Sequence, residues 1–329
     1  MMHYEGALVQ SPLWPAPNTQ ETPRYRYIGE LTGEANFRPA AGGGIGARDV
    51  FNWIVGLVEG TVRPVVLQRP QSGTVDPTGR IYVTDVSRKA VFVFDEAKGE
   101  LDVWDEATSG VRFVSPIGIA LGAGGDILVT DSELGRVFRL DRSGRPAGEF
   151  GAGILKRPTG IARDAATRRV FVADTHAHDI KVFDDEGRLV DTLGRRGEGI
   201  GEFNFPTHLA WSGRTLFVSD MLNSRIQGLG DDGEVTLKFG RPGLYVGNLV
   251  RPKGVATDGE GNIYVVESMY DHLLVFDRLG RLLLSIGGTG RDVGKFYLPA
   301  GVWTDSRDRV YVADMFNGRV VVFQFLGGS

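Results

Sequence analysis

The chain has 329 residues, of which 42% are hydrophobic and 24% are charged, and its formal net charge is −4. This composition indicates a globular protein, and the slight acidity argues against a nucleic-acid or anionic-membrane partner, because such partners require a concentrated basic face. The absence of cysteine excludes disulfides, thiolate metal sites and cysteine nucleophiles. No apolar run reaches the roughly 18 residues of a membrane span. The N-terminus has no signal-peptide pattern, so we expect that any export signal was removed or never existed.

The N-terminal part of the chain contains two predicted segments. Residues 1–23 are rich in proline and are predicted to be an extended leader. The stretch RYRYIGELTGEANF at 24–37 then matches RLLLSIGGTGRDVGKF at 281–296 in a strand, a Gly-rich turn and a closing Phe. Residues 24–31 are therefore predicted to be a strand of a repeat that is completed elsewhere in the chain.

An insertion at residues 38–66 follows this strand, and it contains a predicted helix at 49–58. Its apolar residues lie nearly all the way round the helix, so the helix must be largely covered. One interpretation is that the helix packs on its own chain, over the channel mouth or a blade edge of the β-propeller that the rest of the sequence predicts. This interpretation is favoured because large exposed apolar patches are uncommon on monomers. The other is a hydrophobic patch for a protein or peptide partner, with partner-binding residues Phe51, Trp53, Ile54 and Leu57.

A repeat with a period of 43 to 47 residues occupies the rest of the chain. Each unit contains a Pro-containing segment such as RPTGIARD, a strand such as VFVAD, a third apolar run such as DIKVFD and, in five of six units, a fourth run. The 47 glycines, about twice the usual share of roughly 7%, fit many tight turns between short strands. Four short strands in each of six units predict an all-β, six-bladed β-propeller with four-stranded antiparallel blades.

The sixth unit lacks its fourth run, and residues 24–31 are predicted to supply it. The last blade would then be closed by an N-terminal strand, and residues 24–329 would form a single propeller. Closure by strands from both chain ends leaves only short outer edges.

The segments P-x-G-[IV]-A and [IL]-x-V-[AT]-D, together with DMLNSRI and DMFNGRV, resemble NHL repeats over residues 66–323 and the closing strand. The resemblance implies a six-bladed propeller. It leaves function open, since NHL propellers include protein-interaction modules, RNA-binding modules, exported bacterial proteins and a zinc- and calcium-dependent amidating lyase. The Pro-rich leader resembles the exported bacterial kind, which implies a periplasmic or extracellular location.

An acidic residue ends the second strand of every unit. Because it recurs in every blade, it is interpreted as a structural residue that bonds the backbone donors of the following turn. Arg136, Arg225 and Arg319 follow it by five residues and are possible ion-pair partners. The six acidic residues are Asp85, Asp131, Asp174, Asp220, Glu267 and Asp314.

Histidine is the main departure from the repeat. His176 and His178 lie in one turn of the third blade, and His208 stands where other blades have Gly or Ser, close to the predicted channel. Three imidazoles on neighbouring blades could hold zinc with an open coordination position, so a metal site at His176, His178 and His208 is one hypothesis. The favoured alternative is that these histidines line the channel or the surface without a ligand.

Other motifs point to no reaction. GGGIGA at 42–47 lacks the preceding strand of a dinucleotide site, and no G-x-S-x-G or H-E-x-x-H is present. The leading hypothesis is a non-catalytic scaffold or binding module that engages a protein or peptide on the face carrying the 38–66 insertion, with no cofactor and no nucleic acid. The alternative is a zinc- or calcium-dependent lyase or lactone hydrolase at the channel mouth around His208, and RNA binding comes third.

Overall fold

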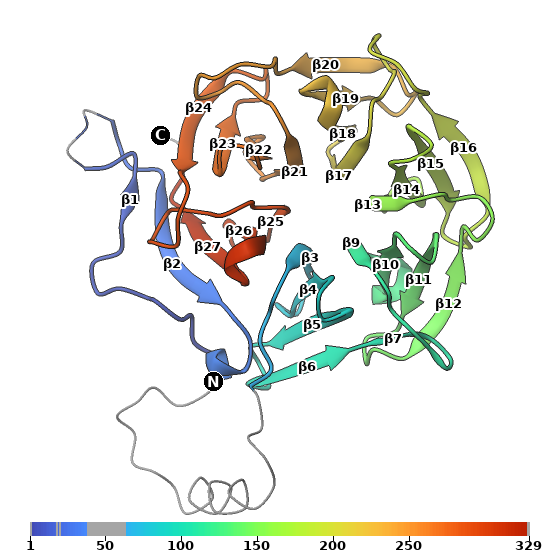
Figure 1. Cartoon of the computed structure of the whole chain (residues 1–329), viewed down its shortest axis with the longest axis horizontal. Helices are drawn as coiled ribbons and strands as arrows, with labels where there is room; N and C mark the ends of the chain where they lie inside the picture. Colours follow the sequence, from blue (N-terminus) through green and yellow to red (C-terminus); the bar gives the residue numbers. More distant parts are fainter. Residues whose placement is uncertain (1, 18, 20, 38–63, 328–329) are drawn as a thin grey trace, which may run out of the picture.

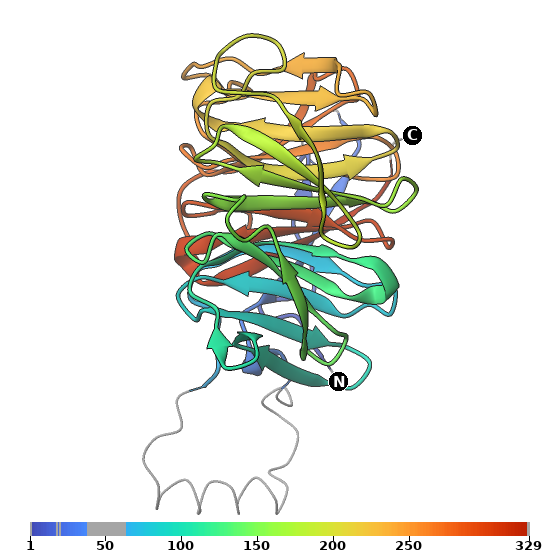
Figure 2. The same ribbon diagram turned by 90° about the vertical axis from the view of Figure 1, so that its right-hand side faces the viewer.

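The computed structural model describes residues 2–17, 19, 21–37 and 64–327, and within them the chain forms a six-bladed β-propeller, as predicted. Six sheets surround a central axis, each with its first strand innermost (Figure 1). The strands cross a flat disc from one face to the other (Figure 2). The second strand of each blade is buried on both sides by neighbouring strands and blades, which explains why these strands are continuously apolar rather than alternating.

The strand bounds follow the repeat. Blade 1 consists of β3 (Pro70–Val75), β4 (Ile81–Asp85), β5 (Ala90–Asp95) and β6 (Glu100–Trp104). Blade 2 consists of β9 (Pro116–Leu121), β10 (Ile127–Asp131), β11 (Arg136–Leu140) and β12 (Pro146–Phe150). Blade 3 consists of β13 (Pro158–Asp164), β14 (Arg169–Asp174), β15 (Asp179–Asp184) and β16 (Leu189–Leu193). Blade 4 consists of β17 (Pro206–Ser212), β18 (Thr215–Asp220), β19 (Arg225–Leu229) and β20 (Val235–Phe239). Blade 5 consists of β21 (Pro252–Thr257), β22 (Ile263–Glu267), β23 (His272–Phe276) and β24 (Leu282–Gly287).

Blade 6 closes the ring with both ends of the chain. It consists of β25 (Val302–Thr304), β26 (Arg309–Asp314), β27 (Arg319–Phe325) and, from the N-terminal region, β2 (Tyr25–Leu31). β2 pairs antiparallel with β27, which confirms the predicted closing strand. A short outer strand, β1 (Leu13–Trp14), adds to β2 from within the predicted leader (Figure 1). The edge of the Trp14 ring packs on Phe323 with centroids 5.4 Å apart, so part of the 1–23 segment is attached to the propeller.

The hydrophobic core consists of clusters that each lie between two adjacent blades. Two of them contain residues of β2: Tyr25 and Tyr27 pack between blades 5 and 6, and Leu31 packs between blades 6 and 1. The closing strand therefore contributes to two blade junctions as well as to its own sheet.

The two faces of the disc differ in their connections. The turns between second and third strands and the links from one blade to the next share one face, here called the link face. It also carries a hairpin, β7 (Glu106–Thr108) and β8 (Val111–Arg112), and the 3-10 turns η3 (Met221–Asn223) and η4 (Met315–Asn317). The remaining 3-10 turns are η1 (Glu34–Phe37) and η2 (Ala123–Gly125).

The two flanks of the 38–66 insertion lie side by side. Gly33 forms a β-bridge with Val66, and the Leu67 amide donates to the Thr32 carbonyl over 2.8 Å. The chain thus leaves the propeller after β2 and returns at the same place before β3. The predicted helix at 49–58 falls on residues outside the described part of the chain.

Candidate functional site

The six acidic residues at the ends of the second strands are structural. In blade 1, Asp85 Oδ2 accepts hydrogen bonds from the backbone amides of Gln68 and Arg69, and Oδ1 accepts from those of Ser87 and Arg88, at 2.6 to 3.0 Å. Each such carboxylate ties the incoming link to the following turn, as the sequence predicts. The equivalent residues make corresponding bonds to their own links in the other blades: Asp131, Asp174, Asp220, Glu267 and Asp314.

Two of the three arginines predicted to pair with these carboxylates do so. Arg225 Nε lies 2.7 Å from Asp220, and Arg319 Nε lies 2.7 Å from Asp314, both in buried ion pairs. Burial raises the pKa of both carboxyl groups, and the arginines and backbone donors oppose that rise. Arg136 instead pairs with Glu149 on the neighbouring strand.

A cavity of about 270 Å³ lies on the propeller axis, lined by the innermost strand of every blade. Its walls come from the middle and end of these strands, for example Val255 to Thr257 of β21, so the cavity lies toward the face opposite the links. Trp211 and Trp303 contribute the largest side chains. Trp303 packs on Gly73, and its Nε1 is buried without a partner.

Small residues near the start of the innermost strands allow adjacent blades to approach. A Cβ built on Gly118 would lie 2.1 Å from the Thr159 carbonyl oxygen, and one on Gly301 would lie 2.3 Å from that of Gln71. His208 occupies the same repeat position in β17, so blade 4 has an imidazole where most other blades have a glycine against the backbone of the next blade. This position is where the sequence predicts a side chain beside the channel.

His208 lines the cavity and is 9% exposed. Both of its ring nitrogens are buried and have no hydrogen-bond partner. Burial, together with a smaller effect of the positive charge of Lys253 on the next blade, lowers the pKa of His208 to about 3, so the imidazole is neutral at physiological pH.

Three further polar residues, Thr207, Ser219 and Lys253, lie on the strands of blades 4 and 5 near His208. Thr207 and His208 form the irregular part of β17 opposite Ser219 of β18, and Thr207 Oγ1 and Ser219 Oγ are also buried without partners. Lys253 of β21 makes no hydrogen bond or ion pair through its ammonium group within the described part of the chain. Burial lowers the pKa of Lys253, and the charge of Arg251 contributes to that decrease.

His178 has a role within the fold that the sequence does not reveal. It adopts a left-handed conformation in the turn after β14, and its Nδ1 accepts a hydrogen bond from the Phe205 amide over 3.2 Å. Asp271 occupies the corresponding position in blade 5 and accepts the Leu298 amide over 2.7 Å. Burial lowers the pKa of His178, and Arg196 and His176 add to the effect.

His176 is exposed in the same turn, and both His176 and His178 meet the Phe205 ring edge-on. Among the residues that the structure describes, no group of three or more His, Asp or Glu side chains is arranged to hold a metal ion. The metal hypothesis for His176, His178 and His208 is therefore not supported by a preformed ligand cluster, and it stays a prediction for metal analysis.

The predicted partner-binding residues Phe51, Trp53, Ile54 and Leu57 lie outside the described residues. The link face nevertheless carries exposed apolar side chains on blades 4 to 6. Leu244 and Tyr245 are each 84% exposed in the link from blade 4 to blade 5. Val246 and Met269 complete this apolar patch, and Leu222, Tyr297 and Phe316 are exposed elsewhere on the same face.

A second cavity, of about 280 Å³, lies within the apolar patch. Tyr245, Met269, Tyr270 and Leu274 line it, together with His272 at the start of β23. These residues follow no motif in the sequence that predicts a site. The apolar triplet LYV at 244–246, in a Gly- and Pro-rich link, could have indicated this cavity from the sequence. Trp303 of the axial cavity could also have been found, because four other blades have Ala at its repeat position.

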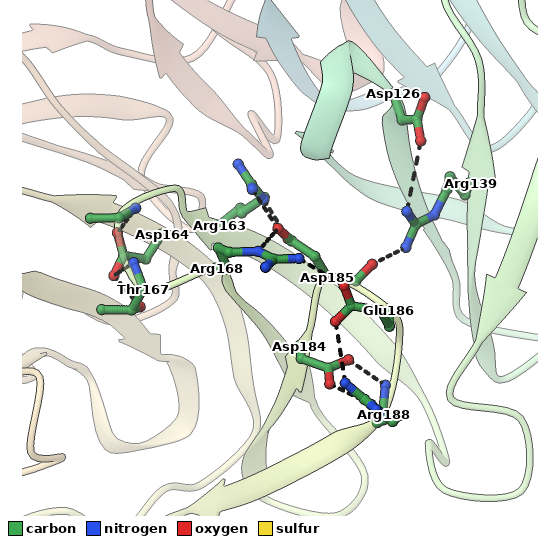
Figure 3. Close-up of polar contacts among 11 residues, drawn as sticks. Asp126, Arg139, Arg163, Asp164, Thr167, Arg168, Asp184, Asp185, Glu186 and Arg188 are labelled. Carbon is green, nitrogen blue, oxygen red and sulfur yellow. Dashed lines mark hydrogen bonds and ion pairs between the residues drawn. The ribbon is translucent and has the colours of Figure 1, made fainter.

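On the face opposite the links, charged residues of blades 2 and 3 form paired clusters (Figure 3). Arg163 of β13 lines the axial cavity, and its Nε and Nη2 both lie 2.8 Å from the Asp185 carboxylate. This pairing raises the pKa of Arg163 and lowers that of Asp185. The charge of Arg163 is thus compensated, whereas that of Lys253 is not.

The structure contains no helix in its described residues that is long and apolar enough to cross a membrane. No family model matches the chain. In sequence, the chain is 33% identical over 141 residues to the protein brain tumor of Drosophila melanogaster, a match that covers 41% of this chain and 13% of the fly protein. The chain therefore spans only a small part of this relative.

Solved structures share the fold at low sequence identity. Virginiamycin B lyase of Staphylococcus aureus has a TM-score of 0.57 at 15% identity, covering 78% of this chain and 80% of the lyase. A gluconolactonase of Xanthomonas campestris has a TM-score of 0.59 at 16% identity, covering 79% and 86% of the two chains. These likenesses establish the six-bladed propeller, and the local match to brain tumor, together with the repeat motifs, supports an NHL-type propeller.

Proposed function

We propose that this propeller is a non-catalytic binding module that engages a protein or peptide partner on its link face. The observation that carries the proposal is the apolar patch around the second cavity, because exposed apolar side chains gathered in this way are typical of interaction sites. Tyr245 and Met269 stand in the patch with 84% and 49% of their surface exposed. Aromatic residues and methionine are enriched at protein interfaces.

The shape and charge of the patch indicate the kind of partner. The cavity of about 280 Å³ has room for one bulky apolar side chain. The Arg251 side chain is exposed, and the Arg251 backbone amide donates to Glu267, which lines the cavity. An extended peptide with an apolar anchor and nearby acidic residues would satisfy both features.

A peptide selection against the purified protein tests this proposal. We expect the enriched peptides to share a bulky apolar residue flanked by Asp or Glu. The double substitution Tyr245→Ser with Met269→Ser should weaken their binding at least ten-fold, because it removes the walls of the cavity. Leu279→Ser is the matched control, since Leu279 is 64% exposed in a turn on the opposite face. Peptides that bind the double variant as tightly as the wild type, or no enrichment at all, would refute the proposal.

The alternative is a zinc- or calcium-dependent lyase or lactone hydrolase with its site around His208. Two observations favour it: His208 lines the axial cavity and has two buried ring nitrogens without partners, and the fold is shared with a lyase and a gluconolactonase. The positive charge of Lys253 opposes a bound cation there. Elemental analysis of the purified protein, followed by assays on lactones with added Zn²⁺ or Ca²⁺, distinguishes this activity from a binding module.

A further inference from the structure

The mouth of the axial cavity, on the face opposite the links, has polar and apolar side chains at one level of the ring. In blades 2 to 6, the last cavity-lining residue of the innermost strand pairs with the residue four positions before the structural carboxylate of that blade. These residues therefore share one register position and surround the mouth as an arc. They are Leu121, Arg163, Trp211, Thr257 and Thr304.

Four polar atoms of the cavity wall are accessible and have no partner in the described part of the chain. Arg163 uses Nε and Nη2 to bind Asp185, and Figure 3 shows its remaining nitrogen, Nη1, directed away from that carboxylate. The other three atoms are the indole nitrogen of Trp211 and the hydroxyls of Thr74 and Thr257, and none of the four is buried. The residues that carry them are half-buried and line the cavity, so a bound molecule can reach them.

The charge of the mouth favours an uncharged ligand. Arg163 is the only charged residue among the described residues that line the cavity, and Asp185 holds it through two bonds of 2.8 Å. An anion would therefore find no uncompensated cation, and a cation would find no free carboxylate. A purely apolar ligand would cover the accessible donors without replacing their bonds to water, at a cost of about 1–3 kcal/mol for each group.

Hydroxyl groups match the free atoms of the mouth. Arg163 Nη1 and Trp211 Nε1 only donate, the Thr257 hydroxyl donates or accepts, and a ligand hydroxyl can pair with all three. The Trp211 ring stacks on Phe171 with centroids 5.2 Å apart, which holds the indole in place. The C–H face of a sugar ring can pack on Trp211 and Leu121 while its hydroxyls reach the polar atoms. The volume of about 270 Å³ is slightly below the usual range for small-molecule sites and so limits the ligand to about one ring.

We propose that the mouth of the axial cavity binds one neutral sugar unit, whose hydroxyls bond to Arg163, Trp211 and Thr257. The ring of the sugar packs on Trp211 and Leu121. A free monosaccharide and the terminal unit of a glycan present the same chemistry to this site. The site is separate from the apolar patch of the link face, and the inference does not depend on the proposed peptide partner.

Calorimetric titration of the full chain with the methyl β-glycosides of glucose, galactose and mannose tests the site. We expect saturable binding of at least one methyl glycoside. Cyclohexanol has the same ring size with a single hydroxyl, and sodium gluconate has the hydroxyls with a negative charge, so both should bind at least ten-fold more weakly. The matching disaccharide distinguishes the two sources of the sugar: tighter binding than that of the methyl glycoside indicates a glycan, equal binding indicates a monosaccharide, and both results support the site.

Two variants test the placement of the sugar. Thr257→Val removes a hydroxyl that has no partner in the described protein and keeps the shape of the side chain, so it should weaken glycoside binding several-fold at unchanged Tm. Thr192→Val, on the exposed strand β16, is the control and should change neither quantity. Trp211→Phe keeps a ring on Phe171 and removes the indole N–H, so it should also weaken binding several-fold.

Three results would overturn the proposal. Glycoside affinity that is unchanged in either variant would show that the sugar does not contact the mouth. Binding of cyclohexanol or gluconate as tight as that of every glycoside would show that the site does not select neutral hydroxylated rings. The absence of saturable binding by all three glycosides would refute the site itself, and the peptide selection against the link face would be unaffected.

Discussion

Substitution of Tyr27 by Ala tests whether the N-terminal strand closes the propeller. Tyr27 lies in β2, opposite Phe323 of β27, and is 1% exposed. Its ring packs against Phe323 with centroids 6.3 Å apart, and its hydroxyl donates to Glu30 Oε1 over 3.1 Å. Removal of the ring would leave a cavity between blades 5 and 6, in the cluster that joins the two ends of the chain.

Truncation of a buried aromatic residue to Ala costs about 3–5 kcal/mol, since it combines lost burial with an unfilled cavity. Typical domains are stable by about 5–15 kcal/mol, so the loss is a large fraction of the total. For a chain of this size it corresponds to a decrease in Tm on the order of 10 °C. The neighbouring Arg26 is exposed, and Arg26→Ala should change the unfolding free energy by less than about 0.5 kcal/mol.

Urea unfolding followed by tryptophan fluorescence measures both variants against the wild type. A decrease below about 1 kcal/mol for Tyr27→Ala would refute the reasoning, because a strand that can lose its buried ring so cheaply does not hold the ring closed. Deletion of residues 1–37 should have a larger effect, with loss of cooperative unfolding or aggregation through the exposed edge of β27. An equally stable monomer without these residues would contradict the assignment of β2.

Three further predictions concern the axis, metal content and nucleic acid. Gly301→Ala should lower the unfolding free energy by about 1–3 kcal/mol, because its Cβ would lie 2.3 Å from the Gln71 carbonyl oxygen. Gly259→Ala is the control and should be nearly neutral, since there is open space around Gly259. Similar Tm values for the two variants would show that the blades can separate at no cost. Elemental analysis should find no stoichiometric transition metal; one zinc per chain that is lost on His208→Gly would move the assignment from binding module to enzyme. Binding to single-stranded RNA at physiological salt should be weaker than micromolar, because the basic residues of the link-face turns alternate with acidic ones and two of them, Arg225 and Arg319, are buried in ion pairs. The other basic residues of these turns are Arg88, Lys89 and Arg136. Tight binding with a steep salt dependence in a filter assay would contradict this prediction.

The sequence predicted the propeller because local sequence patterns determine its strands and turns. Strand runs and turn residues recur in each blade, a proline begins each of β3, β9, β13, β17 and β21, and each hairpin is formed by neighbours in the chain. The closing strand, although distant from its partner in sequence, was predictable because it completes a repeat that otherwise lacks a strand. The same repetition identified the acidic residues such as Asp85 as structural, since a function confined to one site does not require a carboxylate in every blade.

The candidate site depends on contacts that no local pattern encodes. The sequence placed His208 near the axis, but only the tertiary structure showed that both of its ring nitrogens are buried without a partner. The sequence also grouped His178 with His208, whereas the tertiary structure commits Nδ1 of His178 to the Phe205 amide, as it commits Asp271 to that of Leu298. The physical reason is that a repeat fixes which residues point toward the next blade, while the bonds they form depend on the side chains that the next blade presents in return.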